Sequence, residues 1–594
     1  MYQSISDLPF KAVNAVDFEY NFDNPGDHPK PLTMALETGS AEGPSTYWKD
    51  ELEELKSPPF NVGVDGLFLA YFAPAELGCF KALGWSPPHN VIDLYAEFRR
   101  ITNGLYLPEG AGLIGALKYY GLDHLLPTDK DEMRNLILSG GPRTADEVQS
   151  IKEYCAQDTR ALIPLFEAML QSEPWSESTL SHALLRGRYT KAVASMEHRG
   201  IPLDKERLQS FLDRWPRITE QLIREIDQAY GVYEGTTFKV DRFEAYLAKN
   251  KIPWLYNENG KLRLDRDTFS TMARAHPTLL PLHELRKTLS AMQKINLQVG
   301  ADGRNRCMLS PLASKTGRNQ PSNSKFIFGP AKWFRGFIKP TAGMSLAYVD
   351  WSSQEIAVAA ALSGDDLLME AYNSGDPYIS FAIQAGLAPK GATKASHPEI
   401  RNQCKQVVLG TNYGMSAYGV AQAAGIHIST AQNLLQRHKE TYRVFWKWAE
   451  KNMEAGLLGV PLQTCFGWEI RAGIGTESKA NTFLNWPMQA HGAEMMRIAS
   501  ILATEDGLGL CAPIHDAFLL EAPNELIEDH VRRLIAHMEQ ASEYVLGVGR
   551  KCRADSKILS YPDRYMEDEG LDMWERVMSA LAPLETTYSE SEQG

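Results

Sequence analysis

The sequence lacks the features of several protein classes. Its 594 residues contain no apolar run long enough to cross a membrane, and the first residues lack the basic and apolar segments that direct secretion. Only seven cysteines are present, and no two have the close spacing of zinc ligands, so we expect no zinc site. An odd, dispersed set of cysteines is typical of a reducing compartment, and we therefore expect a cytoplasmic protein with no membrane partner.

The chain also lacks an excess of positive charge. Its 61 Lys and Arg residues are outnumbered by 74 Asp and Glu residues, which gives a formal net charge of -13. This balance argues against a general basic coating for nucleic acid, but a locally basic cleft remains open because phosphate contacts are local. A hydrophobic content of 44% supports large packed cores. The length by itself suggests about three or four domains.

One short stretch, residues 346–355 (LAYVDWSSQE), combines a strand-like run with acidic side chains. The apolar run ends on Asp350, and Glu355 begins a helix-like run. A carboxylate where a core strand meets a helix is costly unless it is paired or holds a metal. The alternative interpretation is an Asp that caps the following helix.

A second stretch predicts a helix with a functional face. Arg401, Lys405, Leu409 and Tyr413 recur every four residues, and this spacing lines one face of a helix over about three turns. Two cations, an apolar residue and an aromatic residue in that order suit a phosphate tail, a sugar and a base. A solvated basic stripe is the alternative.

A third stretch places His515 and Asp516 inside an apolar, strand-like run, PIHDAFLL, where such a pair is usually structural. In this order, however, the three stretches resemble motifs A, B and C of family A DNA polymerases, the DNA polymerase I-like group. The chain departs from those motifs at three positions. Trp351 replaces a Tyr of motif A, Leu409 replaces the Phe or Tyr of motif B, and Ala517 replaces the Glu of motif C.

The resemblance implies a template-directed DNA polymerase. Asp350 and Asp516 would hold two Mg²⁺ ions, for which Mn²⁺ can substitute. Arg401 and Lys405 would stabilise charge on the triphosphate, and Lys405 would also be placed to protonate the leaving group. Glu355 would block a ribose 2′-hydroxyl and so select deoxynucleotides. The resemblance implies substrate contacts from four more side chains: Leu409, Tyr413, His515 and Gln489.

Three further segments resemble parts of the same family, and the resemblance implies DNA contacts for the first two of them. They are residues 314–323 (SKTGRNQPSN), residues 485–489 (NWPMQ) and residues 464–471 (TCFGWEIR). In the last of them, Trp468 stands where the family usually has an Arg. The DNA-contacting residues that the resemblance implies are Arg318, Asn323 and Asn485.

The N-terminal part contains a second set of acidic residues. The strand-like run 11–20 includes Asp17 and Glu19, which are two residues apart and so point to the same side of a strand. Like charges held that close usually imply a cation. Tyr154 and Asp158 lie at i and i+4 on one helix face. An exposed strand and a helix-surface pair are the alternatives.

This set resembles the 3′–5′ proofreading exonuclease domain that has an Asp-Glu-Asp-Asp pattern and a Tyr in its third motif. The resemblance implies a phosphodiester hydrolysis that uses two metal ions, in which Tyr154 orients the attacking water. An inactive exonuclease domain is the alternative. The metal ligands that the resemblance implies are Asp17, Glu19, Glu76 and Asp158.

The second exonuclease motif is the least regular part of this resemblance. The family has Asn-x2-Phe/Tyr-Asp there, and Glu76 is the best match, while Asp65 is a rival. Glu76 follows the strand-like run 67–72, whereas Asp65 precedes it. We therefore expect Asp65 at the opposite end of the sheet, roughly 20 Å away and too far to share an ion.

The resemblance predicts an α/β multidomain chain. An RNase H-like exonuclease domain would span residues 1–185, and a right-hand polymerase domain would span residues 186–594. Within the latter we expect a thumb at about 205–300, fingers at about 365–475, and a palm at about 301–364 and 476–594.

The expected partners are primer-template DNA and deoxynucleoside triphosphates. We expect a monomer, in the host cytoplasm if a phage encodes it, and the sequence does not identify a processivity factor. Two other functions are open. A single-subunit RNA polymerase shares the Asp, Lys-x7-Tyr and His-Asp residues but lacks a bulky acid at the position of Glu355. The other is a catalytically silent DNA-binding or scaffold protein.

Overall fold

The computed structural model describes residues 1–39, 43–123, 127–412, 414–472 and 479–591. The chain divides into two compact units, and each unit is made of segments that are far apart in the sequence. The larger unit consists of Met1–Gly200, Met308–Gln320 and Leu346–Ile558, and the smaller unit consists of Ile201–Cys307, Pro321–Ser345 and Leu559–Gly594.

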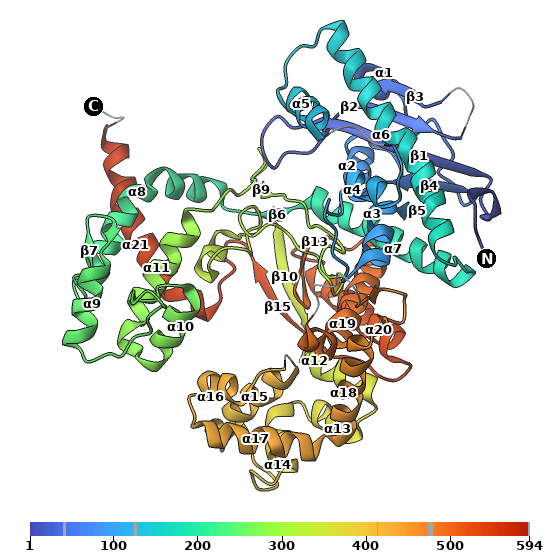
Figure 1. Ribbon diagram of the computed structural model, residues 1–594. Helices are drawn as coiled ribbons and strands as arrows, with labels where there is room; N and C mark the ends of the chain where they lie inside the picture. Colours follow the sequence, from blue (N-terminus) through green and yellow to red (C-terminus); the bar gives the residue numbers. More distant parts are fainter. Residues whose placement is uncertain (40–42, 124–126, 413, 473–478, 592–594) are drawn as a thin grey trace. The chain divides into compact units, whose positions relative to one another are not determined.

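A five-stranded sheet forms the centre of the first 200 residues (Figure 1). Its order is β3-β2-β1-β4-β5; β2 is antiparallel to both of its neighbours, and β4 is parallel to both of its neighbours. The strands are β1 (Ala12–Asn21), β2 (Lys30–Glu37), β3 (Ser45–Trp48), β4 (Gly66–Ala70) and β5 (Asn90–Asp93).

Helices cover both faces of this sheet, because alternate side chains of a strand point to opposite faces. On β4, Leu67 and Leu69 belong to one apolar core, and Phe68 and Ala70 belong to another. The first core includes side chains of α3 and α6, and the second includes side chains of α2 and α7. The helices of this region are α1 (Lys49–Glu54), α2 (Ala73–Ala82), α3 (Leu94–Thr102), α4 (Leu113–Tyr119), α5 (Pro127–Leu138), α6 (Ala145–Ser172) and α7 (Glu177–Arg199), with a 3-10 turn at Ile5–Asp7.

A second sheet has the order β13-β14-β10-β15. Its strands are β10 (Met344–Trp351), β13 (Leu510–Ile514), β14 (Ala517–Pro523) and β15 (Ala554–Ser560). Strands β13 and β14 form an antiparallel hairpin in which Ile514 pairs with Ala517, so His515 and Asp516 form the turn. Two helices, α19 (Ala480–Glu505) and α20 (Ile527–Leu546), pack against each other beside this hairpin. Most of α19 is buried, as expected for a helix in the middle of a large unit.

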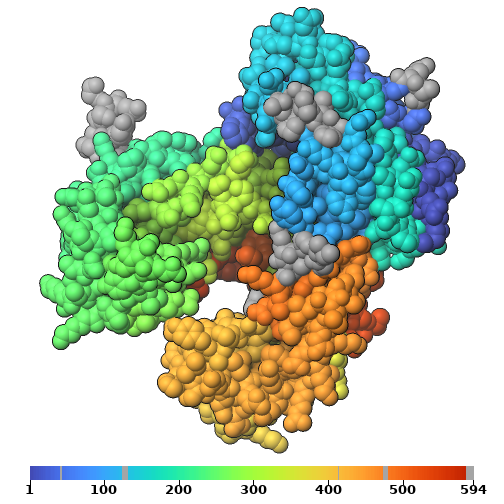
Figure 2. Space-filling view, in the orientation of Figure 1, coloured from blue at the N-terminus to red at the C-terminus, as the bar shows by residue number. Residues whose placement is uncertain are grey.

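A group of helices follows β10 in the sequence. These helices are α12 (Gln354–Ser363), α13 (Asp366–Asn373), α14 (Pro377–Gln384), α15 (Pro398–Asn412), α16 (Ala417–Ala424), α17 (Ile428–Thr441) and α18 (Arg443–Leu457). The gold-coloured part of the space-filling view, which contains α14–α17, forms a lobe of its own (Figure 2). The chain then passes through a short hairpin of β11 (Leu462–Gln463) and β12 (Glu469–Ile470) before it enters α19.

The smaller unit is mainly helical. Its helices are α8 (Lys205–Asp227), α9 (Val240–Lys249), α10 (Arg266–Ala275), α11 (Leu280–Met292) and α21 (Asp568–Ser591), with 3-10 turns at Pro277–Leu279 and Lys332–Phe337. Two short strand pairs complete it: β6 (Ile201–Pro202) with β9 (Arg304–Asn305), and β7 (Tyr233–Glu234) with β8 (Thr237–Phe238). Helix α8 packs against α11 and α21.

The α/β class that the sequence predicted is confirmed. The expected division into exonuclease domain, thumb, palm and fingers is finer than the two units and stays a prediction. Its first boundary, between residues 185 and 186, falls inside the continuous helix α7. Among the described residues, no helix is both long enough and apolar enough to span a membrane.

Candidate active sites

Asp350 and Asp516 lie close together where strands of the second sheet end. Asp350 is the penultimate residue of β10, and Asp516 is in the turn between β13 and β14. The Trp351 amide donates a hydrogen bond of 3.2 Å to the Asp516 carbonyl, which ties the end of β10 to this turn. Burial and the nearby charges of Asp516 and Asp555 raise the pKa of Asp350 to about 6. Burial also raises the pKa of Asp516.

Asp555 is a third acidic residue of this site, and our sequence analysis missed it. It lies on β15, the neighbour of β10, and its carboxylate accepts a short hydrogen bond from the Ser352 hydroxyl. Ala517, where related motifs have a Glu, is fully buried on β14. The third carboxylate, that of Asp555, therefore comes from β15, which pairs with β10 on the side away from β14. No motif surrounds Asp555, so only the strand order reveals it.

Helix α15 carries the predicted motif B face. Arg401, Lys405 and Leu409 are partly exposed, whereas Val407 and Gly410 on the opposite side are buried. The helix that the four-residue spacing predicted is thus confirmed. Tyr413, the last residue of the predicted stripe, lies outside the described residues.

Arg401 has a fixed position on this face. Its Nε donates a hydrogen bond of 2.5 Å to the Asp376 carboxylate, and its guanidinium carbon lies 5.2 Å from the centre of the Tyr378 ring. Asp376 is itself held at the N-terminus of α14, where it accepts hydrogen bonds from the amides of Tyr378 and Ile379. The side chain of Arg401 is therefore oriented by a helix cap and an aromatic ring.

Glu355 and Gln489 meet between α12 and α19. The Gln489 amide donates a short hydrogen bond to the Glu355 carboxylate, and the charge of Glu355 contributes to the raised pKa of Asp516. The two helices approach closely at Gly492, where a Cβ atom would lie 2.8 Å from the Gln354 side chain. A glycine at this position allows Glu355 and Gln489 to reach each other.

The expected DNA-contacting residues are found in different parts of the structure. Arg318 lies near Asp516, since its positive charge acts to lower the pKa of that carboxyl. His515, which is expected to contact the substrate, is exposed and has a left-handed backbone, with φ +57°. Asn485 lies on α19, and its buried side-chain oxygen has no hydrogen-bond partner among the described residues. Asn323 belongs to the smaller unit, where it is exposed.

A second acidic cluster lies on the first sheet. Asp17 and Glu19 are on β1, and the Cys155 thiol of α6 donates to the Asp17 carbonyl at 3.3 Å. Burial and the charges of Asp158, Glu19 and Asp17 raise the pKa of the Tyr154 hydroxyl. Helix α6 therefore brings Tyr154 and Asp158 over the strand that carries Asp17 and Glu19.

Glu76 lies beside the same strand. It is in the first turn of α2, only 4% exposed, and its Oε2 atom has no hydrogen-bond partner among the described residues. Burial, followed by the charges of Asp17 and Glu19, raises the pKa of Glu76 well above its ordinary value. Asp65 is partly exposed and pairs with Lys11, which precedes β1, at 3.1 Å. The structure thus places Glu76, and not Asp65, beside Asp17 and Glu19.

Both clusters consist of oxygen ligands, which Mg²⁺ and Mn²⁺ prefer. Within the described part of the chain, no group of three or more His, Cys, Asp or Glu side chains is arranged closely enough to hold a metal ion by itself. The buried, unpartnered oxygen of Glu76 nevertheless fits a cation, because such an oxygen is costly without one. At the second sheet, the mutual repulsion of Asp350, Asp516 and Asp555 fits a cation for the same electrostatic reason.

Comparison with known proteins gives a consistent result. Residues 258–556 match the model of "DNA polymerase family A". DNA polymerase I of Aquifex aeolicus is 24% identical over 384 residues, which are 61% of this chain and 64% of that protein. The thermostable DNA polymerase I of Thermus thermophilus is 26% identical over 381 residues, 59% of this chain and 45% of that protein. The DNA polymerase of Mycobacterium phage D29 is 26% identical over 352 residues, 57% of this chain and 56% of that protein.

The chain therefore spans less than two thirds of the length of these relatives. A solved structure, the POL domain of Pol1 from M. smegmatis in complex with DNA primer-template and dNTP, is similar in fold. The similarity has a TM-score of 0.72 and covers 93% of this chain and 96% of that chain, at 16% sequence identity. The fold is thus shared well beyond the residues that match the family model.

Proposed function

The chain belongs to DNA polymerase family A, and from this premise we propose that it is a template-directed DNA polymerase that adds deoxynucleotides to a primer 3′ end. The observation that carries this proposal is the proximity of Asp350 and Asp516, where burial, followed by the charges of Asp516 and Asp555, raises the pKa of Asp350 to about 6. The names of the relatives, and the primer-template and dNTP of the Pol1 structure, support the same substrates for this chain.

Asp350 and Asp516, with Asp555 beside them, are the residues that would hold Mg²⁺ or Mn²⁺. Two such ions, when bound, lower the pKa of the primer 3′-hydroxyl and neutralise charge on the triphosphate and the leaving pyrophosphate. The protein's own contribution is to hold these carboxylates close together in a partly buried place, where their ionised forms lack compensation until a cation binds. A carboxyl whose pKa is raised by like charges binds a cation readily, because the cation relieves the repulsion.

The nucleotide would be bound by the exposed face of α15. Arg401 and Lys405 would contact the triphosphate, and Lys405 would supply a proton to the leaving group. The ion pair of Arg401 with Asp376 uses its Nε, so its two Nη groups form a second set of donors that can be directed at phosphate. Leu409 would pack near the sugar, and Tyr413 near the templating base.

Glu355 would select deoxynucleotides. Its carboxylate is fixed by Gln489, and Glu355 lies near Asp516. A ribose 2′-hydroxyl next to this pair would have to displace a charged, hydrogen-bonded side chain. We expect a nucleotide that lacks this hydroxyl to be accepted, because it leaves the Glu355–Gln489 pair intact.

We propose in addition that the N-terminal region is a 3′–5′ exonuclease. Asp17, Glu19, Glu76 and Asp158 would hold two metal ions, and Tyr154 would orient the attacking water. The buried, unpartnered oxygen of Glu76 supports this, because it lies beside Asp17 and Glu19. The alternative is a region with the same fold and no nuclease activity, since Glu76 has a longer side chain than the Asp of the family motif.

The two proposals together imply a polymerase that corrects its own errors. The partners would be primer-template DNA and deoxynucleoside triphosphates, and the protein would act as a monomer. Metal dependence on Mg²⁺, with Mn²⁺ as a substitute, would be common to both sites.

A primer-extension assay tests the polymerase proposal. We expect extension with dNTPs and none with rNTPs, and we expect Asp350→Asn or Asp516→Asn to abolish extension while binding of the primer-template persists. The physical reason is that either change removes a metal ligand and leaves the DNA-contacting surface intact. Extension with rNTPs would support an RNA polymerase. Binding without extension by the wild-type chain would support a scaffold protein.

A further inference from the structure

We propose that the N-terminal region also acts as a positioning element of the polymerase site, because Arg99 of its helix α3 and Asn103, the residue that follows α3, hold the loop that carries Arg318, which lies near Asp516. This inference rests on the proposed polymerase function. The loop, residues 313–318, belongs to Met308–Gln320, a segment that packs in the larger unit although the chain on both sides of it belongs to the smaller unit. What anchors this segment therefore sets the place of Arg318.

The loop itself is closed by its own hydrogen bonds. The Ser314 hydroxyl accepts a hydrogen bond of 2.8 Å from the Arg318 amide, and the Ser314 carbonyl accepts one of 2.9 Å from the Gly317 amide. Gly317 has φ +74°, and a Cβ atom there would lie 3.0 Å from the Trp468 ring nitrogen. The loop is thus a rigid turn, and its position depends on the side chains around it.

Three side chains meet at one carbonyl of this loop. The Lys315 carbonyl accepts hydrogen bonds from Asn103 at 2.7 Å, from Trp486 at 2.7 Å and from Trp468 at 3.2 Å. A carbonyl oxygen has two lone pairs, so this acceptor is fully used. Trp468 and Trp486 come from the polymerase part of the chain, and Asn103 comes from the N-terminal region.

Asn103 joins the loop to a second element. The same side-chain amide donates to the Glu469 carbonyl on β12 at 2.6 Å, and the Asn103 carbonyl accepts from the Arg471 amide at 3.0 Å. The next residue, Gly104, has φ +92°, and a Cβ atom there would lie 2.3 Å from the Arg471 carbonyl oxygen. The end of α3 therefore fits against β12 in one arrangement only.

Arg99 adds an independent anchor. It lies one turn before Asn103, and its Nη2 donates a hydrogen bond of 2.8 Å to the Ala313 carbonyl at the start of the loop. On the far side, Arg497 of α19 donates to the Gly317 carbonyl at 2.6 Å. The loop is thus held at its start and middle by α3 and at its end by α19.

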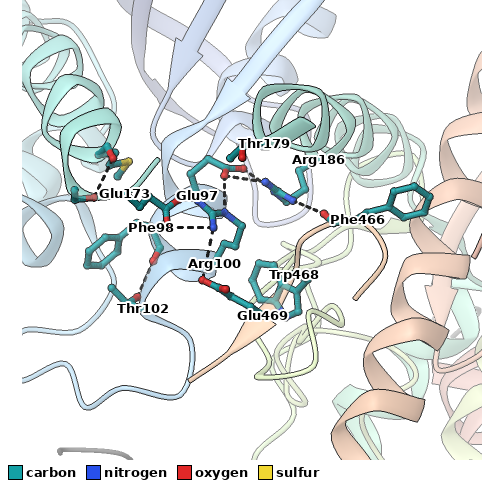
Figure 3. Close-up of polar contacts among 12 residues, drawn as sticks. Glu97, Phe98, Arg100, Thr102, Glu173, Thr179, Arg186, Phe466, Trp468 and Glu469 are labelled. Carbon is teal, nitrogen blue, oxygen red and sulfur yellow. Dashed lines mark hydrogen bonds and ion pairs between the residues drawn. The ribbon is translucent and has the colours of Figure 1, made fainter. Parts of the chain in front are cut away.

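A buried ion network fixes the N-terminal region against the hairpin of β11 and β12 (Figure 3). Glu97 of α3 accepts hydrogen bonds from Arg186 at 2.6 and 2.9 Å and from Arg100 at 3.1 Å. Arg100 also pairs with Glu469 at 3.7 Å, and Arg186 donates to the Phe466 carbonyl at 3.0 Å. Buried charges of this kind resist displacement, because separating them leaves a charge without a partner.

An apolar core reinforces this contact. It contains Ala96 of α3, Leu312 just before the loop, and Trp468 and Trp486. Trp468 occupies the position at which related sequences usually have an Arg, and it is fully buried. Its ring therefore contributes packing and a hydrogen-bond donor to the loop, which an exposed cation would not do.

The test compares Asn103→Ala with Thr102→Val, a matched control in the preceding residue. Thr102 is also buried, but its hydroxyl bonds only the Phe98 carbonyl of α3. We expect Asn103→Ala to weaken primer-template binding on the order of tenfold, since it leaves two buried carbonyls short of a donor and frees the loop. We expect Thr102→Val to match the wild type. Hydrogen exchange of the peptide that covers residues 309–320 should rise in Asn103→Ala only.

A double-mutant cycle separates positioning from general damage. If Asn103 acts through Arg318, then Asn103→Ala should cause little further loss of DNA binding in an Arg318→Ala background. Arg99→Gln, which shortens the side chain whose distal Nη2 donates to the Ala313 carbonyl at a less buried position, is the second variant in case Asn103→Ala fails to fold, and the same non-additivity is expected for it.

The outcomes are distinguishable. Losses that simply add, or wild-type binding by a folded Asn103→Ala and a folded Arg99→Gln, would overturn the inference while the polymerase proposal stands. A wild-type chain that binds no primer-template would overturn both.

Discussion

At the scale of single residues, the side chains of the polymerase site are oriented before any substrate binds. Arg401 is held by Asp376, and Glu355 is held by Gln489. A group that already has its working orientation loses little conformational freedom when the nucleotide arrives, so more of the binding free energy remains for catalysis. The exception is Leu409, whose apolar side chain offers no hydrogen bond to a sugar.

Leu409 leads to a prediction about the nucleotide sugar. A Tyr hydroxyl at this position could fill the place of a missing 3′-hydroxyl, and Leu has no such group. We expect Leu409→Tyr to increase the use of dideoxynucleotides relative to dNTPs, measured as the ratio of termination to extension in a competition assay. Leu409→Phe is the matched control, because it adds the ring without the hydroxyl. An unchanged ratio in Leu409→Tyr would mean that residue 409 does not face the sugar.

Asp350 leads to a prediction about stability without metal. Its pKa is raised from 3.8 to about 6, so the folded chain binds a proton more tightly than the unfolded chain, and stability falls as the pH rises between these two values. We expect metal-free Asp350→Asn to have a higher Tm than the wild type at pH 7.5, and this difference to disappear near pH 4.

Added Mg²⁺ provides the control for this prediction. A ligand that binds only the folded state raises Tm, so Mg²⁺ should raise the Tm of the wild type more than that of Asp350→Asn. A variant that is less stable than the wild type at pH 7.5 would show that burial and the charges of Asp516 and Asp555 do not disfavour the ionised form of Asp350.

At the scale of elements, the first sheet separates two rival acidic residues. Glu76 follows β4 and opens α2, whereas Asp65 precedes β4 and pairs with Lys11. Since β1 and β4 are parallel, the residues that follow β4 lie toward the end of β1 that carries Asp17 and Glu19. The direction of one strand thus decides which acid can share an ion with them.

We therefore expect Glu76→Ala to abolish 3′–5′ degradation of single-stranded DNA and to leave primer extension unchanged. Asp65→Ala is the matched control and should preserve both activities. The measurement is the shortening of a labelled oligonucleotide in Mg²⁺ or Mn²⁺ without dNTPs. Loss with Asp65→Ala alone would contradict the assignment. No degradation by the wild type would mean that the region has lost nuclease activity, with the longer Glu side chain as the first candidate cause.

Sequence reasoning succeeded where the signal was local. The four-residue spacing from Arg401 predicted α15, and the apolar run before Asp350 predicted β10, because helix and strand periodicity are properties of neighbouring residues. Asp555 was missed because it reaches the site from β15, about 200 residues further along, with no pattern around it. The role of Asn103 was missed for the same reason, since its partners Lys315 and Glu469 are distant in sequence.

At the scale of the whole molecule, the N-terminal region shares one compact unit with residues 346–558. Helix α7 runs without interruption from the N-terminal region into contact with α19 and β13. Its Arg186 is buried against Glu97, while Arg188, two residues later, pairs with Glu505 at the surface. These two arginines of one helix therefore offer a direct comparison of a buried and an exposed ion pair.

The last prediction uses this comparison. Burial alone would raise the pKa of Glu97, but Arg186 and Arg100 lower it, so the ion network stabilises the fold above the ordinary pKa of 4.5 and this stabilisation is lost as the pH falls further. We expect Arg186→Gln to reduce the free energy of unfolding at pH 7.5 by about 3–5 kcal/mol, because it leaves a buried carboxylate short of a partner. Arg188→Gln should cost less than about 1 kcal/mol. Urea unfolding followed by fluorescence measures both values. If the two variants differed little, the network would not be what joins the N-terminal region to the rest of the unit. A transition of the larger unit that splits in Arg186→Gln and stays single in Arg188→Gln would support that role.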